Sequence, residues 1–408
     1  MLEGDARIKR FYLFRAVTAF SVWMPFWTLW VYGNLESVFL ITVVDVAFWV
    51  TMIGFQIPAG LLGDRYGRKK VLFLGEALFA VGVLSFGLST EFYQFVIANI
   101  VWALGACFIV SGDTPFLYDT LIELKREREF MKIMGTANAV MFMVNAVACV
   151  VGGYIAYSTE HINLTLIVAA LVSLMGTSTI LLLKEPKVKR AEFASYRTQF
   201  KHGFRHVFTT RAILVLVLFQ ILLQVAVYVM AVFRSVYLFE DLELSLFWIG
   251  ISYASFAIVG VIVVRKASSF EELAGEKGAL MFMYASMFTS FIVIFLIQSP
   301  VVIVMQYLIY AVSDLQSPII GGYINRRVDS DHRSTVVSIS NFMFTAVLVA
   351  IEVSAGWAAT EWGVRSSLLI LALCTAPVGM YLLRLWSRIV DAEKAARTAA
   401  ETPAAASN

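Results

Sequence analysis

The segment GLLGDRYGRKK, residues 60–70, joins two long apolar stretches of the chain. It holds one acid, Asp64, and four basic residues, and the stretches on either side, at about residues 38–62 and 71–89, are each long enough for a helix to cross a bilayer. Gly67 permits a tight turn, and Gly60 allows a neighbouring helix to approach closely. Because Lys and Arg gather on the cytoplasmic side of membranes, the segment predicts a cytoplasmic loop between two membrane-spanning helices.

The composition of the whole chain fits a membrane protein. Of its 408 residues 60% are apolar and only 15% are charged, and the mean hydropathy is +0.78. These values leave too little polar surface for a soluble enzyme, a nucleic-acid-binding protein or a disordered chain. Since backbone groups in lipid must be satisfied within the segment, and the apolar runs are too long for barrel strands, we expect an all-α membrane protein with twelve transmembrane helices. The runs lie at about residues 11–32, 38–62, 71–89, 92–120, 133–157, 162–183, 211–236, 245–264, 278–297, 300–323, 335–358 and 366–386.

Basic residues predict the orientation. With the N-terminus inside, 30 of the 32 Lys and Arg residues fall in or beside cytoplasmic segments, and the exceptions are Arg234 and Arg365. This asymmetry predicts a multi-pass protein of the cell membrane with both termini in the cytoplasm. The opposite connections are acidic and carry Glu36, Glu91, Glu160, Glu240, Asp241, Glu243 and Glu361.

A basic connection near the midpoint suggests two halves. We expect an N-terminal six-helix bundle at 1–183, a cytoplasmic linker at 184–210, a C-terminal six-helix bundle at 211–388 and a disordered, Ala-rich tail at 389–408. A shift of 203 residues supports a pseudo-repeat of the two bundles, because it superposes Pro115 on Pro318, Asn138 on Asn341 and Gly153 on Gly356.

The loop at residues 60–70 resembles the hallmark of the major facilitator superfamily, Gly-x-x-x-Asp-Arg-x-Gly-Arg-Lys, and the twelve-span layout extends the resemblance over essentially the whole chain. The resemblance implies a transporter in which this loop is a conformational latch: its Asp faces the start of span eleven, and an Arg pairs with an acid at the cytoplasmic end of span four. Asp119 is the matching acid, and Ser334 to Ser338 would begin span eleven. The latch residues here are Gly60, Asp64, Arg65, Gly67, Arg68, Lys69 and Asp119.

Within this family the chain is most similar to the twelve-span drug:proton antiporters, and the match is incomplete. Val101 stands where such antiporters carry an Arg, four residues before Gly105. Of their Gly-Pro-x-x-Gly-Gly element only Gly152 and Gly153 are present. These departures leave the direction of transport open.

Acidic residues inside the predicted spans are candidates for proton coupling. A charge in the hydrocarbon costs about 2.5–3.5 kcal/mol even on the lenient insertion scale, and a carboxyl group shielded from water holds a proton more readily. Asp45 and Asp113 are the first choices, and Asp314 and Glu352 complete the set. We expect Arg15 and Glu76, near the membrane edges, to have structural roles or to extend toward the headgroups.

Polar and aromatic side chains at helical spacing outline a possible substrate cavity. Polar side chains can instead join helices by hydrogen bonds, and tryptophans are often packing residues. Arg234 has three possible roles: neutralising an acid, binding an anionic substrate or extending outward. The cavity candidates are Trp23, Trp27, Trp49, Gln56, Gln220, Gln224, Tyr228, Arg234, Tyr310 and Asn341.

The function that we expect is secondary active transport by alternating access, namely proton-coupled efflux of amphipathic or drug-like small molecules. The alternative is an importer, a proton symporter or facilitator, of an organic anion or a sugar, and a receptor or membrane enzyme on the same scaffold is a weaker possibility. The expected partners are a small-molecule substrate, protons and the lipid bilayer, with no nucleic acid and no cofactor, and we expect a monomer. His202 and His206 have metal-ligand spacing, but no Cys or acid cluster accompanies them, so no metal is expected. The sequence contains no phosphate-binding loop, which argues against direct use of ATP.

Overall fold

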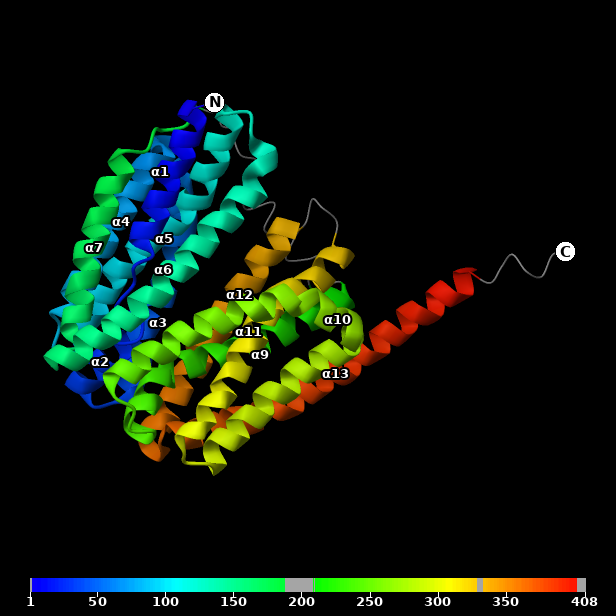
Figure 1. Ribbon diagram of the computed structural model, residues 1–408. Coiled ribbons are helices and arrows are strands. Elements are labelled where there is room, and N and C mark those ends of the chain that lie inside the picture. The colour runs from blue at the N-terminus through cyan, green and yellow to red at the C-terminus, as the bar shows by residue number, and fades with distance from the viewer. Residues whose placement is uncertain (1, 188–207, 209, 329–332, 402–408) are drawn as a thin grey trace. The chain divides into compact units, whose positions relative to one another are not determined.

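The computed structural model describes residues 2–187, 208, 210–328 and 333–401, and within these ranges the chain is helical and has no strand (Figure 1). Nine of the described helices are long and apolar enough to cross a membrane. One of them, α10 (Leu246–Leu296), is 51 residues long and covers two predicted spans. The protein is therefore an all-α membrane protein with the predicted twelve-helix architecture.

The helices follow the predicted apolar runs in order. The first half contains α1 (Leu2–Thr18), α2 (Trp27–Leu35), α3 (Val38–Tyr66), α4 (Arg68–Gly87), α5 (Phe92–Glu123), α6 (Phe130–Thr159) and α7 (Asn163–Leu181). The second half contains α9 (Arg211–Val236), α10, α11 (Ile303–Arg327), α12 (Arg333–Trp362) and α13 (Val364–Glu401). Three short turns complete the described elements: the 3-10 turns η1 (Glu127–Glu129) and η3 (Pro300–Val302), and the π-helical turn η2 (Tyr237–Asp241).

The first predicted span, 11–32, is not one helix. It is divided between α1, which begins nine residues before the apolar run, and α2, with non-helical backbone between them. Pro25 lies in this break, and a proline in a helix interior lacks the N–H and clashes with the preceding turn. The interruption moves the helical part of α1 toward the N-terminus and places Arg15 in its last turn.

Two other boundaries differ from the prediction. The connection expected at 265–277 is helical except at Gly275, where φ is 66° and ψ is 171°, a left-handed conformation that favours glycine. The tail expected to be disordered from residue 389 continues α13 as far as Glu401, because its alanines are strong helix formers. Ser334 and Ser338 fall in the first turns of α12, as expected for the start of span eleven.

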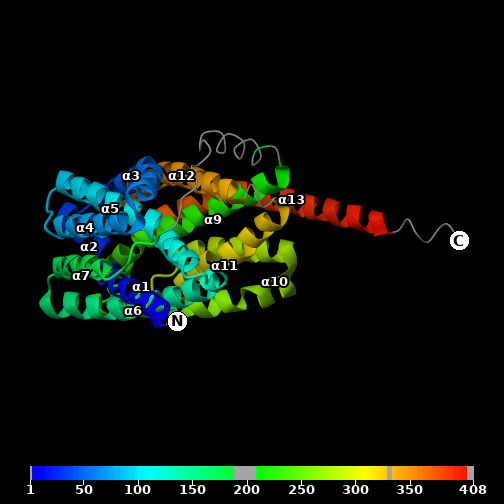
Figure 2. The ribbon, with the colours of Figure 1, turned by 90° about the horizontal axis from the view of Figure 1, so that it is seen from above.

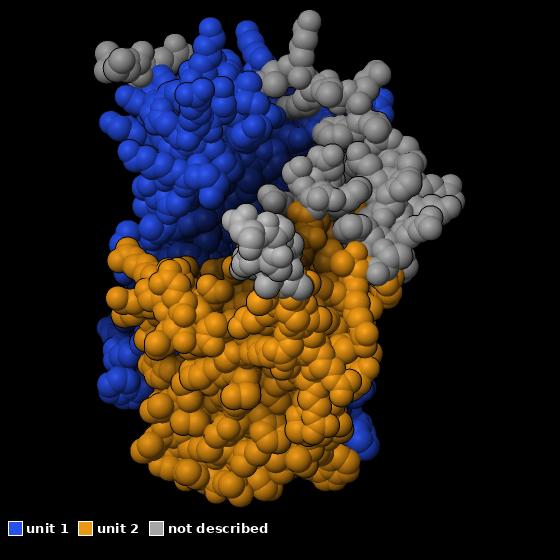
Figure 3. Space-filling model, turned by 90° about the vertical axis from the view of Figure 1, so that its right-hand side faces the viewer, with its two compact units in different colours: residues 1–192, 232–258, 352–361 blue, residues 193–231, 259–351, 362–408 orange. Residues whose placement is uncertain are grey.

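The described chain divides into two compact units, coloured separately in Figure 3. Unit 1 contains residues 1–192, 232–258 and 352–361, and unit 2 contains residues 193–231, 259–351 and 362–408. Most of the predicted linker at 184–210, with His202 and His206, lies outside the described residues, so the division into two six-helix bundles at this point stays a prediction.

Within unit 1, α1 and α3 to α7 lie side by side, as two perpendicular views show (Figures 1 and 2). Helices α4 and α5 are in close contact along their length. A Cβ at Gly82 would collide with the backbone of Trp102, and one at Gly105 would collide with the backbone of Phe79. Small residues thus allow the two helices to approach closely, which is a common means of helix association in membranes.

Candidate functional site

A buried ion pair lies inside unit 1. Arg15 of α1 pairs through Nη1 with the carboxylate of Asp113 on α5, and its Nη2 donates a hydrogen bond of 2.8 Å to Oδ1 of Asn138 on α6. The side chains of Arg15 and Asp113 are only 15% and 8% exposed. One guanidinium therefore connects three helices, and Arg15 does not extend toward the headgroups, the alternative to a structural role that we considered.

Glu76 of α4 belongs to the same cluster. It is 3% exposed, and its carboxyl group interacts electrostatically with that of Asp113. The cluster therefore has two carboxyl groups and one guanidinium. Because an unpaired charge is expensive to bury, a group of this composition can take up a proton. Glu76 was predicted to lie near a membrane edge, in a structural role or extending toward the headgroups, whereas the structure places it beside Asp113, one of the two first candidates for proton coupling.

A second acid pair joins α3 to α12. Asp45 accepts a hydrogen bond of 3.0 Å from Nε1 of Trp49, and its carboxyl group interacts electrostatically with that of Glu352, which is completely buried. The same two helices are in contact further along: a Cβ at Gly356 would collide with Thr42. Close to this point the backbone N–H of Phe39 donates to Oγ1 of Thr360 at 2.8 Å. Asp45 and Glu352 were both predicted as coupling residues, but their proximity was not predicted.

Arg234, near the end of α9, is 5% exposed. Its guanidinium carbon lies 3.7 Å from the ring centroid of Tyr253 and 5.0 Å from that of Phe256, both on α10. Ser235 forms a 2.6 Å hydrogen bond with the hydroxyl of the same tyrosine. The guanidinium lies over two aromatic rings and is buried. Of the three roles considered for Arg234, an outward extension is therefore not observed.

The tryptophan candidates of the first span lie in an aromatic cluster. Trp23 packs edge-on against Trp102, with ring centroids 4.5 Å apart, and Trp27 lies 6.4 Å from Phe86. Both are half-buried. This arrangement is typical of helix packing, the alternative to a cavity role that we left open. Gln56, by contrast, is exposed.

The remaining candidates, Asp314 for proton coupling and five residues for the cavity, belong to unit 2. Asp314 on α11 is half-buried and lies so close to Gly260 of α10 that a Cβ there would collide with the carboxylate. The rings of Tyr228 and Phe344 are 6.5 Å apart. Gln220, Gln224 and Tyr310 are half-buried and Asn341 is exposed.

The latch residues gather where α3 ends and α4 begins. Gly67 makes the turn with φ of 106°, and Arg68 pairs with Asp64 and lies 3.8 Å from Asp119 on α5, measured from Nε to Oδ2. The predicted pairing of Arg68 with Asp119 is therefore present. Lys69 donates through Nζ to the carbonyls of Leu181 and Leu183, at 2.9 and 2.7 Å.

Two further residues of this loop differ in their surroundings. Arg65 lies over the ring of Tyr66, 5.4 Å from its centroid. No heavy atom of the described chain lies within 4 Å of a Cβ built on Gly60, so the close helix approach predicted there is not seen.

Glu185 also contacts this loop and was not among the predicted site residues. Its carboxylate accepts hydrogen bonds from the backbone N–H groups of Arg68, at 2.8 Å, and Lys69, at 2.7 Å. These are the first residues of α4, where unpaired N–H groups and the helix dipole favour a negative charge. An acid directly before Pro186, at the end of the sixth apolar run, was the available signal.

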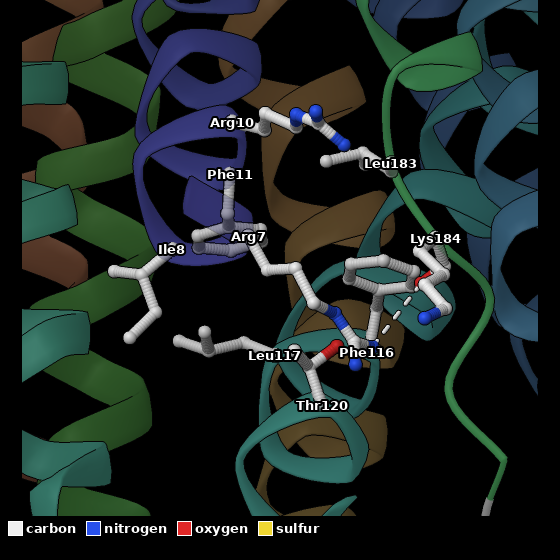
Figure 4. Close-up of a pocket in the computed structure, with 9 residues that line it drawn as sticks. All are labelled: Arg7, Ile8, Arg10, Phe11, Phe116, Leu117, Thr120, Leu183 and Lys184. Atoms are coloured by element: carbon white, nitrogen blue, oxygen red, sulfur yellow. Dashed lines mark hydrogen bonds between the residues drawn. The ribbon is translucent and has the colours of Figure 1, made fainter. Parts of the chain in front are cut away.

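A small hollow lies near the same end of unit 1, among Arg7, Phe11, Phe116 and their neighbours (Figure 4). Arg7 donates to Oε2 of Glu123 at 3.1 Å and to the carbonyl of Lys184 at 3.5 Å. The hollow has a volume of about 10 Å³, which is no more than a water molecule requires, so it is not a substrate site.

Comparison with known proteins agrees with this architecture. Residues 11–351 match the Major Facilitator Superfamily. The chain belongs to this family of transporters, and it is a transporter rather than an enzyme.

Individual relatives are distant. The chain is 30% identical over 137 residues to an uncharacterized transporter of Buchnera aphidicola, and 26% identical over 173 residues to multidrug resistance protein 1 of Bacillus subtilis. These matches cover 34% and 42% of this chain, and they span only 34% and 43% of the relatives' own lengths. The crystal structure of a point mutant of the nucleoside transporter NupG superposes with a TM-score of 0.80 at 14% identity, over 93% of this chain and 100% of that one. This likeness shows the shared fold.

Proposed function

We propose that this transporter exports amphipathic or drug-like molecules in exchange for protons, and that the Arg15–Asp113 pair carries the coupling. The observation behind the proposal is the buried contact of Arg15 with Asp113 and Asn138. A proton on Asp113 neutralises the carboxylate and weakens its hold on Arg15. Because the guanidinium joins α1, α5 and α6, protonation changes how these helices are held together.

Two contacts within unit 1 support alternating access as the mechanism. Besides α3 and α12, helices α6 and α10 approach closely, since a Cβ on Gly153 would lie 3.1 Å from the Cα of Gly250. Both contacts lie toward the helix ends that the charge distribution assigns to the outside. The α3–α12 contact, with the acid pair of Asp45 and Glu352, and the α6–α10 contact would both separate when the transporter opens outward. Protons at the acid pair then provide a second point of coupling.

The proposed cargo and direction rest on relatives of this chain. Multidrug resistance proteins are among the curated relatives with significant similarity, although they match only part of the chain. The half-buried cavity candidates of unit 2, Gln220, Gln224, Tyr228 and Tyr310, carry amide and aromatic groups, which suit amphipathic molecules better than strongly polar ones.

The test is transport by the purified full chain in proteoliposomes, with the permanent cation ethidium as the probe. With an acidic interior, proton exit drives ethidium uptake. Asp113→Asn is expected to slow the gradient-driven rate by about tenfold, the size of a modest coupling free energy, while counterflow exchange without a gradient continues. Glu361→Gln, an exposed carboxylate, is the matched control. Gradient-driven uptake that Asp113→Asn leaves unchanged would contradict the proposal.

Import of an organic anion is the second candidate, and the buried guanidinium of Arg234 is the observation that favours it. The guanidinium lies over the rings of Tyr253 and Phe256 within the membrane region, where a cation attracts an anionic group. In the same vesicles, uptake of an organic anion driven by an acidic exterior and abolished by Arg234→Gln would favour import over export.

A further inference from the structure

A cavity of about 480 Å³ lies in unit 1, at the opposite end of α3 from the latch. It is formed by the C-terminal turns of α2, the start of α7 and the π-helical turn η2. Its volume falls within the range of about 300–1,000 Å³ that is typical of small-molecule sites. None of the Arg15 cluster, the Asp45–Glu352 pair or the latch contributes to its lining.

The lining combines apolar surface with negative charge. Leu29 and the rings of Tyr32 and Phe239 provide the apolar and aromatic part, and Glu36 and Glu240 provide two carboxylates. Phe239 is 39% exposed although it is a large hydrophobic residue. The carboxylates of Glu36 and Glu240, with that of Asp241, act electrostatically on the hydroxyl of Tyr32, so their field reaches the aromatic wall of the cavity.

Local backbone geometry places these groups. Phe239 and Glu240 are consecutive residues of η2, and π-helical turns are often found at functional sites. Gly33 lines the cavity from α2, and no described heavy atom lies within 4 Å of a Cβ built on it. The cavity is therefore open next to Gly33, and a side chain added at this position would extend into free space.

We propose that this cavity binds an amphipathic cation, whose apolar body contacts Leu29, Tyr32 and Phe239 and whose positive charge faces Glu36 and Glu240. Aromatic faces and carboxylates are complementary to an organic cation and unfavourable for an anion. The site is separate from the proposed coupling cluster, and by the predicted orientation it lies on the outer side, where an exported cation would leave the protein.

The experiment places a thiol inside the cavity and measures its protection. Gly33→Cys is made in the full-length Cys374→Ser chain, because Cys374 is exposed whereas Cys107 and Cys149 are buried. The protein is reconstituted into phosphatidylcholine nanodiscs and labelled with a charged maleimide while tetraphenylphosphonium is titrated. We expect protection that saturates, and that requires about three- to tenfold more of the cation when Glu36→Gln and Glu240→Gln are added.

Matched variants define the controls. Glu91→Gln removes a carboxylate on the same predicted side that does not line the cavity, and should leave protection unchanged. A thiol at Gly135→Cys, another position with an open Cβ, should not be protected. The proposal is overturned if tetraphenylphosphonium fails to protect the cavity thiol, if the neutral triphenylphosphine oxide protects it equally well, or if the two glutamine substitutions have no effect.

Two further measurements test whether a lipid occupies the cavity and whether binding depends on Asp113. If phosphatidylethanolamine in the nanodisc protects the thiol by itself, the occupant is a lipid amine and the proposal is wrong. Asp113→Asn should retain protection by tetraphenylphosphonium. Protection without proton-coupled transport would thus contradict the proposed function alone, and coupled transport without protection would contradict this inference alone.

Discussion

The turns at Gly67 and Gly275 have the same construction with charges of opposite sign. In unit 1, Gly67 is followed by a cation, Arg68, which pairs with an acid near the end of α5. In unit 2, Gly275 is followed by an acid, Glu276, which pairs with Arg327 at the end of α11. Both glycines have positive φ, 106° and 66°. Both units thus have a glycine with positive φ followed by a charged residue, but the sign of that charge differs.

The cations Arg68 and Arg327 also differ in how closely they contact the helices beside the turn. Arg68 is 3.8 Å from Asp119, whereas Arg327 donates to Glu276 at 2.9 Å and to Glu393 of α13 at 2.7 Å. Arg327 also lies over the ring of Trp386, 4.9 Å from its centroid. Arg327 therefore ties three helices through short contacts, whereas Arg68 has a short pair with Asp64 across the turn and only a long contact with Asp119 of α5. We interpret the unit 1 turn as the one that rearranges during transport and the unit 2 turn as a fixed support.

The largest expected contrast is between Arg68→Gln and Arg327→Gln. Arg68→Gln should lower ethidium counterflow by about tenfold, because the rearranging contact is lost, and should lower stability by about 1–3 kcal/mol, because Asp64 loses its cation. Arg327→Gln should lower stability by about 1–3 kcal/mol, because two glutamates lose their shared cation, with transport within about twofold of wild type per folded protein. Thermal melting and counterflow are measured on the same preparations. Equal effects of both substitutions on both measurements would remove the distinction between the two turns.

The glycines give a smaller contrast. A Cβ on Gly67 would lie 2.9 Å from Oε1 of Glu185 and would also be strained by the positive φ, so Gly67→Ala should cost about 2 kcal/mol. At Gly275 no described atom lies within 4 Å of the added Cβ, so only the strain of about 1 kcal/mol remains. Gly321→Ala, at a helical position with an open Cβ, serves as the control in thermal melting. If Gly275→Ala destabilises as much as Gly67→Ala, the contact with Glu185 does not contribute.

The smallest effect is expected at Glu185, whose carboxylate caps the start of α4. Glu185→Gln removes the negative charge and replaces one of the two accepting oxygens with an NH2 group that cannot accept, so a loss of about 0.5–1 kcal/mol is expected. The exposed Glu160→Gln is the control. A melting temperature identical to that of the control would mean that neither the charge nor the second hydrogen bond stabilises the protein.

The helix count and the latch could be predicted from the sequence because both depend on local features. Apolar run lengths specify the spans, and the 60–70 segment carries its own turn residue and charges. Gly275 was not recognised, because the helix continues through the polar residues before it. The 203-residue repeat between the two halves places Gly322 at the position that corresponds to Asp119. The repeat therefore did not indicate that Arg327 would pair with the residue after Gly275.

The partners of the buried charges could not be predicted for a different reason. Asp113 was predicted as a coupling residue. Arg15 was expected to lie near a membrane edge because it is close to the start of an apolar run. Helix α1 begins at Leu2, so the run did not mark the start of the helix. The proximity of Asp45 and Glu352 depends on the packing of two helices far apart in sequence, which local periodicity does not encode.

Coupling at Asp113 requires that this residue exchanges a proton as substrate binds. The direct measurement is proton release from the purified chain in a mildly acidic, weakly buffered solution when ethidium is added, followed with a pH-sensitive dye. Wild type should release protons on binding, and Asp113→Asn should bind ethidium with little or no release. Equal release from both proteins would contradict proton coupling at Asp113.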